Sequence, residues 1–193
     1  MSDDSRLIRA ASAGDHDAFG ALVRRRQARV FWTALQIVGN EEDARDVVQE
    51  VFIRLWRVLP RYKAERSFTT WLYRITVNLA IDAHRRRQVR PDQQSSAPVE
   101  TSEVAQSGAS ADAIGQNEIQ QIFLHLARRL SAQQRAVFVL KEMNDMDSSD
   151  IAKVLDISPS TVRNHLHQAR KSLRRGLATH YPEYAALRRP EKR

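Results

Sequence analysis

The chain has 193 residues, enough for one large domain or two small ones, and carries a formal net charge of +8 with a pI of about 10.4. It contains no cysteine, which excludes disulfides, thiolate metal sites and cysteine nucleophiles. No apolar run approaches the roughly 18 residues of a membrane span, and the first residues lack the pattern of a secretory signal. We therefore expect a cytoplasmic protein.

The charge divides the chain into three parts. Residues 1–88 have a net charge of +5, residues 89–117 of −3, and residues 118–193 of +6. The middle part is rich in Gln, Ser, Ala and Pro and has no aromatic residue, which predicts a flexible acidic linker between two domains. Basic domains attract phosphate backbones, although positive charge also serves general solubility.

The first part predicts three helices. Apolar residues from Phe19 to Leu35 recur at helical spacing, and Gly39 and Asn40 break that helix. Acidic residues at 41–43 favour the start of a second helix, whose apolar stripe runs from Val47 to Leu59. Pro60 ends it. A loop over residues 61–66 precedes a third helix, from about Phe68 to Arg87.

Two polar faces in this part are candidate binding surfaces. The outer side of the second helix suits either solvent or a partner, and its residues are Asp46, Gln49, Glu50 and Arg54. On the third helix, Arg74, Asn78, Ile81 and Arg85 share one face, and the neighbouring aromatics either pack in the core or stack on bases. We expect single-stranded DNA to be contacted by Tyr62, Lys63, Arg74, Asn78, Arg85 and Arg86.

After the linker we expect helices over 118–130 and 132–142, the second capped by Ser131. Residues 147–174 then predict a helix-turn-helix. Asp147 can cap its first helix, the turn lies at 156–158, and Ser158 and Pro159 open the second helix.

The second helix of this motif has one apolar and one polar side. Its inward residues recur at spacings of four, three and four, from Val162 to Leu173. The polar side suits a DNA major groove, where Arg reads guanine and Asn or Gln reads adenine, although an ordinary helical hairpin also has such a side. The expected duplex contacts are Ser160, Thr161, Arg163, Asn164, His167, Gln168, Arg170 and Lys171.

Neither a metal nor another cofactor is expected. His165 and His167 are two apart on a helix and do not share a face. No phosphate-cradling Gly-rich loop or Ser/His/Asp spacing is present, so we expect no enzyme activity. The basic tail, residues 181–193, suggests no specific role.

Three runs of the sequence resemble a known family. They are Asp-Ala-Arg-Asp-Val-Val-Gln-Glu-Val-Phe (43–52), Ser-Phe-Thr-Thr-Trp-Leu-Tyr-Arg-Ile-Thr-Val-Asn (67–78) and the helix-turn-helix (147–174). In order and spacing they resemble the extracytoplasmic-function (ECF) sigma factors of the sigma-70 superfamily. The resemblance implies an all-α fold with two small domains, a region-two helical bundle (1–88) and a region-four helix-turn-helix (118–180), joined by the linker (89–117).

The resemblance also implies roles and partners. The second helix would bind the clamp helices of the polymerase β′ subunit, and residues 62–87 would recognise and open the promoter −10 element. The helix-turn-helix would read the −35 element and touch the β flap, and an anti-sigma factor would regulate the protein. Two positions depart from the family pattern, with Asp145 where Gly is common and Ser149 where Glu is usual.

The main alternative is a stand-alone helix-turn-helix regulator with a sensing or dimerising N-terminal domain. It predicts selective duplex binding by the chain alone, whereas a sigma factor binds promoters strongly only with core polymerase. A nucleic-acid enzyme has little support in the sequence.

Overall fold

A computed structural model describes residues 3–62, 67–89 and 111–186. All regular elements in these ranges are helices, which confirms the all-α class for the described part of the chain. The elements are α1 (Asp3–Ser12), α2 (His16–Val38), α3 (Glu41–Val58), η1 (Leu59–Arg61), α4 (Phe68–Val89), α5 (Ala111–Ala127), α6 (Ala132–Phe138), η3 (Val139–Met143), α7 (Ser148–Leu155), α8 (Pro159–His180) and α9 (Pro182–Ala186).

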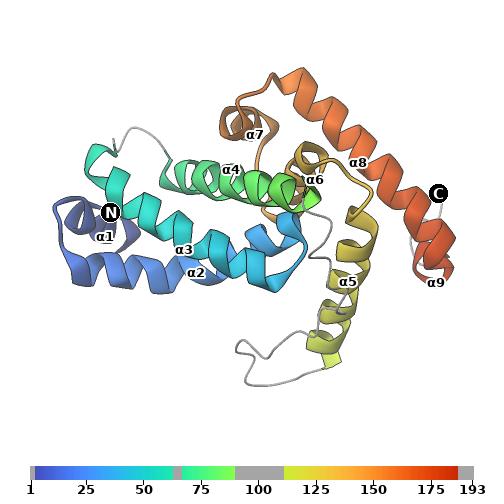
Figure 1. Ribbon diagram of the computed structural model, residues 1–193, viewed down its shortest axis with the longest axis horizontal. Coiled ribbons are helices and arrows are strands. Elements are labelled where there is room, and N and C mark those ends of the chain that lie inside the picture. Colours follow the sequence, from blue (N-terminus) through green and yellow to red (C-terminus); the bar gives the residue numbers. More distant parts are fainter. Residues whose placement is uncertain (1–2, 63–66, 90–110, 187–193) are drawn as a thin grey trace, which may run out of the picture.

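Helices α1–α4 form the first domain, with α2 packed against the other three (Figure 1). The predicted break between α2 and α3 is confirmed. Gly39 has φ 93°, a left-handed conformation that glycine adopts without strain, and its N–H donates to Leu35 O. Asn40 caps α3 by accepting a hydrogen bond from the Asp43 N–H at 2.8 Å. The sequence reading missed α1, which packs against α2 through buried Ile8 and Ala11.

Helices α5–α9 form the second domain. Ser131 caps α6 in a reciprocal capping box with Gln134, as predicted for the cap. The helix then continues into a π-helical turn, η3. Helix α8 crosses α5 closely at Gly176, where an added Cβ would lie 2.8 Å from Leu126 Cδ2.

The helix-turn-helix forms as predicted, with one correction. Ser158 accepts a hydrogen bond from the Thr161 N–H at 3.1 Å, and Pro159 occupies the first turn of α8. Asp156 makes the turn at φ 55°. Asp147 holds the N-cap position of α7, but its side chain makes no capping hydrogen bond. The Asp147 backbone carbonyl accepts from the N–H groups of Asp150 and Ile151 instead.

The predicted start of the first helix after the linker needs correction. Helix α5 begins at Ala111 rather than at Glu118, so it includes residues 111–117 of the predicted linker. The remaining linker residues, 90–110, lie outside the described part of the chain.

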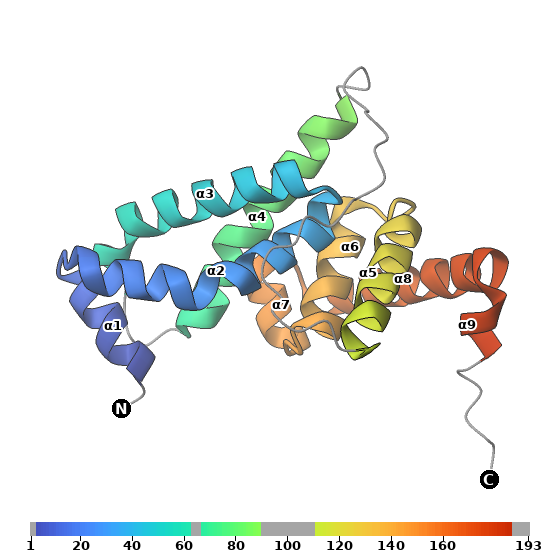
Figure 2. The ribbon, with the colours of Figure 1, turned by 90° about the horizontal axis from the view of Figure 1, so that it is seen from below.

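The two domains pack against each other. Helix α4 contacts α6 and α7, and α2 contacts α6 and η3. Both views place α6 and α7 beside α4 (Figures 1 and 2). Buried side chains from both domains belong to one continuous apolar cluster.

Candidate nucleic-acid and polymerase interface

The polar side of α8 is open to solvent. Val162, Leu166 and Ala169 are buried against the second domain, as their spacing predicted. On the opposite side Arg163 and Asn164 are exposed near the N-terminal end of the helix, where a major-groove reader contacts base edges. His167, Gln168, Arg170 and Lys171 continue this exposed side.

Not all expected contacts on α8 are free. The hydroxyls of Ser160 and Thr161 lie 2.7 and 2.8 Å from Ser158 Oγ, so both are engaged in the cap. Arg170 forms an ion pair with Glu142 of η3. The other expected contacts on α8, which are exposed and lie outside these interactions, are Arg163, Asn164, His167, Gln168 and Lys171.

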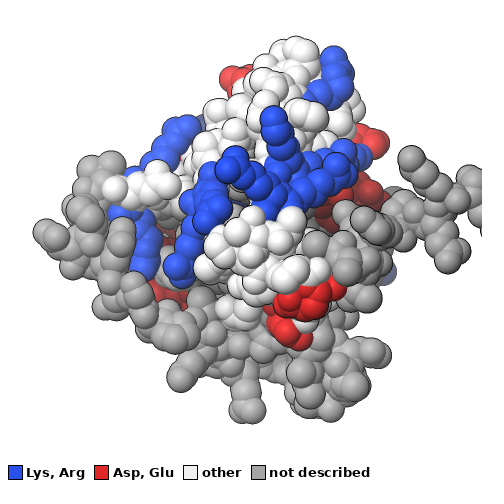
Figure 3. Space-filling model, turned by 90° about the vertical axis from the view of Figure 1, so that its right-hand side faces the viewer, with Lys and Arg blue, Asp and Glu red and all other residues white. Residues whose placement is uncertain are grey.

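Positive charge dominates this helix. The sequence of α8 contains five Lys and Arg residues and no Asp or Glu. The face of the molecule at the right of Figure 1, where α5, α8 and α9 lie, shows a broad gathering of Lys and Arg side chains (Figure 3). Such a surface attracts a phosphate backbone.

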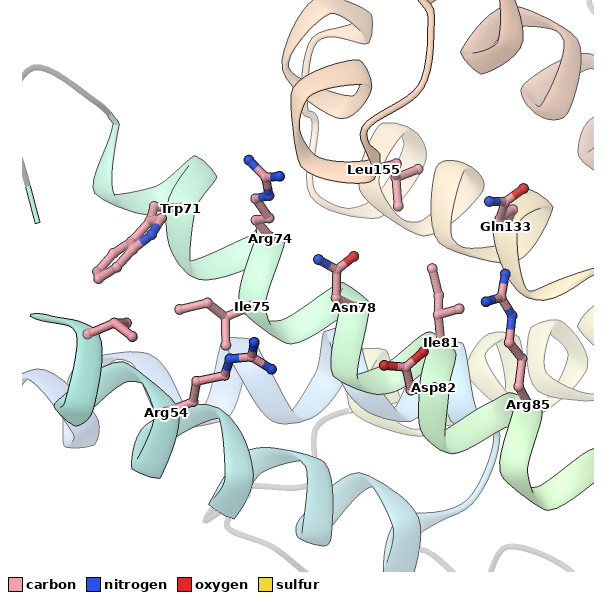
Figure 4. Close-up of a pocket in the computed structure, with 11 residues that line it drawn as sticks. Arg54, Trp71, Arg74, Ile75, Asn78, Ile81, Asp82, Arg85, Gln133 and Leu155 are labelled. Carbon is pink, nitrogen blue, oxygen red and sulfur yellow. The ribbon is translucent and has the colours of Figure 1, made fainter. Parts of the chain in front are cut away.

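The polar face of α4 is arranged differently. Arg74, Asn78 and Arg85 are exposed on one side of the helix, as the spacing predicted, whereas Ile81 between them is buried. These residues point across a hollow of about 560 Å³ toward Gln133 of α6 and Leu155 of α7 (Figure 4). The polar face of α4 is therefore directed toward the second domain.

The other expected single-strand contacts lie at the two ends of α4. Tyr62 is half-buried, with its ring 5.1 Å from that of Trp71 and 5.6 Å from that of Phe68. Burial raises the pKa of the Tyr62 hydroxyl. Arg86 is exposed near the C-terminal end of α4. Lys63 lies outside the described residues.

The four expected polymerase contacts on α3 do not share one surface. Asp46, Gln49 and Glu50 are exposed. Arg54 is exposed as well, but its side chain lines the hollow, next to Ile75 of α4 (Figure 4).

Sequence reasoning missed an apolar groove next to Gln49. It has a volume of about 590 Å³ and includes Phe19, Trp56 and the exposed Ile53. The available signal was Ile53, a large apolar residue off the buried stripe of α3.

Sequence reasoning also missed Arg135, which lies at the joint between the domains. It is only 1% exposed, and its Nε donates to the carbonyl of Gln36 near the C-terminus of α2. The C-terminal end of a helix carries partial negative charge, which favours a cation. Burial, and secondarily the charge of Arg128, lower the pKa of Arg135 to about 10, so it stays charged at neutral pH.

His84 of α4 belongs to the same joint. Its Nδ1 lies 3.4 Å from the carbonyl oxygen of Val38. Burial, and then the charge of Arg135, lower the pKa of His84, while Val38 and Asp43 act in the opposite direction. The neutral imidazole is therefore favoured beside the buried guanidinium.

Asn144 makes a second polar contact between the domains. It lies just after η3, and its Oδ1 accepts a hydrogen bond from the Tyr73 hydroxyl of α4 at 2.5 Å. The Thr33 hydroxyl of α2 lies 3.4 Å from the same oxygen. Asn144 Nδ2 donates to Val139 O within its own domain.

The described residues contain no cluster of three or more metal-ligating side chains. No helix among them has the length and apolar character to cross a bilayer. The described side chains form polar and cationic faces that suit binding.

Comparisons with known proteins agree with this arrangement. The sigma-70 region 2 model matches residues 22–90, and the sigma-70 region 4 model matches residues 120–173. The chain is 32% identical over 178 residues to the ECF RNA polymerase sigma factor SigW of Bacillus subtilis, covering 88% of this chain and 94% of the relative. It is 30% identical over 176 residues to the ECF RNA polymerase sigma-E factor of Escherichia coli K12, covering 88% and 92%.

Solved structures share the fold. CnrH, solved in complex with the cytosolic domain of CnrY, matches with a TM-score of 0.68 and 24% identity over 93% of this chain and 99% of that one. The sigma factor RpoE of Bartonella quintana, solved with the anti-sigma factor NepR, matches with a TM-score of 0.63 and 20% identity over 84% and 98%. The two family matches, together with relatives that span nearly the whole chain, show that this protein belongs to the ECF sigma factors of the sigma-70 family.

Proposed function

We propose that this chain directs core RNA polymerase to promoters by dividing recognition between its two domains. In the first domain (residues 1–88) α3 binds polymerase, and the segment from Tyr62 to Arg87 recognises and opens the −10 element. In the second domain α8 reads the −35 element. The observation that carries the proposal is the pair of cationic helix faces, one on α4 and one on α8, in the two parts of the chain matched by the family models.

Promoter opening in this proposal relies on binding energy rather than on enzymatic catalysis. Taking a base out of the stack costs about a few kcal/mol, least where pairing is already weak. Arg74 and Arg85 would hold phosphates of the displaced strand, and Asn78 would contact a base. Polymerase supplies the remaining contacts and places the chain with the chromosome, in the cytoplasm.

The test is transcription in vitro with core polymerase and a promoter library. We expect the chain to select promoters that share two elements, one near −10 and one near −35. Selective duplex binding that is equally strong without polymerase would instead favour the stand-alone regulator.

Polymerase binding is tested on α3. Replacing Asp46 and Glu50 together with Lys reverses two exposed charges, and we expect it to abolish capture of core polymerase while leaving the fold intact. The charge-matched control replaces Asp147 and Glu183, exposed acids of the second domain, with Lys. If the α3 variant still captures core enzyme as the control does, the assignment of α3 is wrong.

We also propose that an anti-sigma factor regulates this chain. Support comes from RpoE of Bartonella quintana, which was solved with an anti-sigma factor and has the same fold. Affinity purification of the tagged chain from its own cells should yield a small protein that blocks transcription in the assay above. Recovery of core polymerase alone, under inducing and non-inducing conditions, would contradict the proposal.

A further inference from the structure

Three arginines line the hollow between α4 and the second domain without a partner for their charge. Arg54 comes from α3, and Arg74 and Arg85 come from α4 (Figure 4). Within the described ranges of the chain, none of the three forms an ion pair with a carboxylate. Asp82 is the one acidic residue among the described side chains that line the hollow. A hollow with an excess of one sign of charge and a partly apolar lining concentrates ions of the opposite sign.

Two amide side chains line the same hollow from facing walls. Asn78 belongs to α4, and Gln133 belongs to α6 of the second domain (Figure 4). Each amide has a carbonyl oxygen that accepts hydrogen bonds and an NH₂ group that donates them. That combination pairs with the edge of a nucleotide base, as when Asn or Gln contacts adenine. The hollow therefore offers groups for a base as well as cations for an anion.

The remaining lining and the size of the hollow suit an organic molecule. Trp71 and Ile75 of α4 and Leu155 of α7 contribute apolar side chains (Figure 4). An indole ring can stack on a base. The volume of about 560 Å³ lies within the range of about 300–1,000 Å³ for small-molecule pockets. Arg74 and Arg85 are eleven positions apart, which is about 16 Å along a helix, so the hollow spans more than a single phosphate ion.

We propose that this hollow binds a free nucleotide that carries two or more phosphates. The three arginines hold the phosphates, because a guanidinium forms paired, charge-assisted hydrogen bonds with phosphate oxygens. Asn78 and Gln133 contact the base, whose ring lies against the apolar lining. Nucleotide binding uses both walls of the hollow, whereas the proposed −10 strand contacts the first domain alone. Gln133 therefore distinguishes the two ligands.

Titration calorimetry with ADP tests the site on the full chain without polymerase. We expect ADP to bind at least about tenfold more tightly than pyrophosphate or adenosine, because the phosphates and the base each contribute to the affinity. All three probes are measured at one salt concentration, since salt screens the charges of the hollow. Pyrophosphate that binds as tightly as ADP would overturn the proposal, because general attraction of anions to a basic chain would then suffice.

Variants on the two walls test whether the nucleotide lies in the hollow. Gln133→Ala should weaken ADP binding by about fivefold, on the scale of one lost hydrogen bond. Arg85→Gln should weaken it by about tenfold or more, because a charge-assisted contact is lost. Arg24→Gln, at an exposed position of α2, removes the same charge elsewhere and should leave the ADP affinity unchanged. Circular dichroism checks that each variant keeps its helices. Equal losses in Arg24→Gln and Arg85→Gln, or no loss in Gln133→Ala, would overturn the proposal.

The holoenzyme separates this site from the proposed −10 contact. The probe is a short single strand that carries the non-template −10 sequence of a promoter mapped with the holoenzyme. Holoenzyme with Gln133→Ala should bind the strand as tightly as wild type, whereas holoenzyme with Arg85→Gln should bind it more weakly. Equal losses in both variants would overturn the proposal, because Gln133 would then belong to the DNA contact. A free chain that does not bind ADP would overturn the nucleotide site and leave the proposed function intact. A wild-type holoenzyme that does not bind the strand would contradict the proposed function alone.

Discussion

Helices α4 and α8 have the same length of 22 residues, and both carry several cations, yet their polar faces stand in different surroundings. The face of α8 is open to solvent along its exposed side. The face of α4 looks into a hollow closed on its far side by α6 and α7. The proposed −35 reader is thus exposed, whereas the proposed −10 face of α4 lines a hollow beside the second domain.

The difference has a physical origin in the residues between the cations. On α4, Ile81 interrupts the polar series and is buried in the cluster shared by both domains. On α8 the exposed positions are polar throughout, from Arg163 to Lys171. An apolar residue within a polar face gives another domain a place to dock, because its burial is favourable.

The largest effect is expected on the open face. Arg163→Ala and Asn164→Ala should each weaken −35 recognition by roughly 1–3 kcal/mol, the value of a lost bidentate contact. The measurement is transcription by the holoenzyme from a mapped promoter and from the same promoter with its −35 element scrambled. Gln27→Ala, at an exposed position of α2, is the control. Equal loss on both promoters would show that these residues do not read the −35 sequence.

The polar face of α4 should respond to substitution only in the holoenzyme, because in the free chain it lines the hollow beside the second domain. Asn78→Ala should weaken binding of the −10 strand by about 1–2 kcal/mol when polymerase is present, on the scale of one lost base contact. The free wild-type chain and the free variant should bind that strand equally poorly. A marked loss in the free chain would mean that α4 is accessible without polymerase.

A smaller effect is expected at the start of α8. Ser158→Ala removes the oxygen that accepts from the Thr161 N–H, and should lower the free energy of unfolding by about 1 kcal/mol. Urea unfolding measures this loss. Ser149→Ala, at an exposed position of α7, should change it little. If the two variants had the same free energy of unfolding, the Ser158 cap would not stabilise α8.

The smallest effect is expected before α7. Asp145 has φ 50°, a left-handed backbone conformation that glycine adopts at less steric cost than other residues. Asp145→Gly should relieve the left-handed backbone and raise the free energy of unfolding by about 0.5 kcal/mol. Asp145→Ala should not raise it, because alanine keeps the steric cost. If alanine raised the free energy of unfolding as much as glycine does, the cause would be the loss of the Asp145 charge rather than relief of the backbone.

Local structure was largely predictable from the sequence. The Gly39–Asn40 break, the cap at Ser158 and the buried stripe from Val162 to Ala169 follow from propensities and spacing that act within a few residues. The π-helical turn at η3 and the early start of α5 carry no comparable local signal. The predicted side-chain cap at Asp147 was wrong. Aspartate is a common N-cap residue, but its presence at that position does not ensure that its side chain forms the capping hydrogen bond.

The docking of the domains was not predictable in this way. It depends on Arg135 meeting Gln36 and on Asn144 meeting Tyr73, pairs brought together only by the complete fold. Each of these residues looks ordinary in its own helix. The spacing of Arg74, Asn78 and Arg85 placed them on one face of α4. It could not predict which helices lie opposite that face.

The central claim is that this chain reads a promoter only as part of the holoenzyme. Its most direct test is the affinity for a mapped promoter duplex and for a scrambled duplex, measured at one salt concentration with and without core polymerase. We predict weak, poorly selective binding by the chain alone and tight, selective binding once polymerase is added. Equally tight and selective binding in the two conditions would contradict the account.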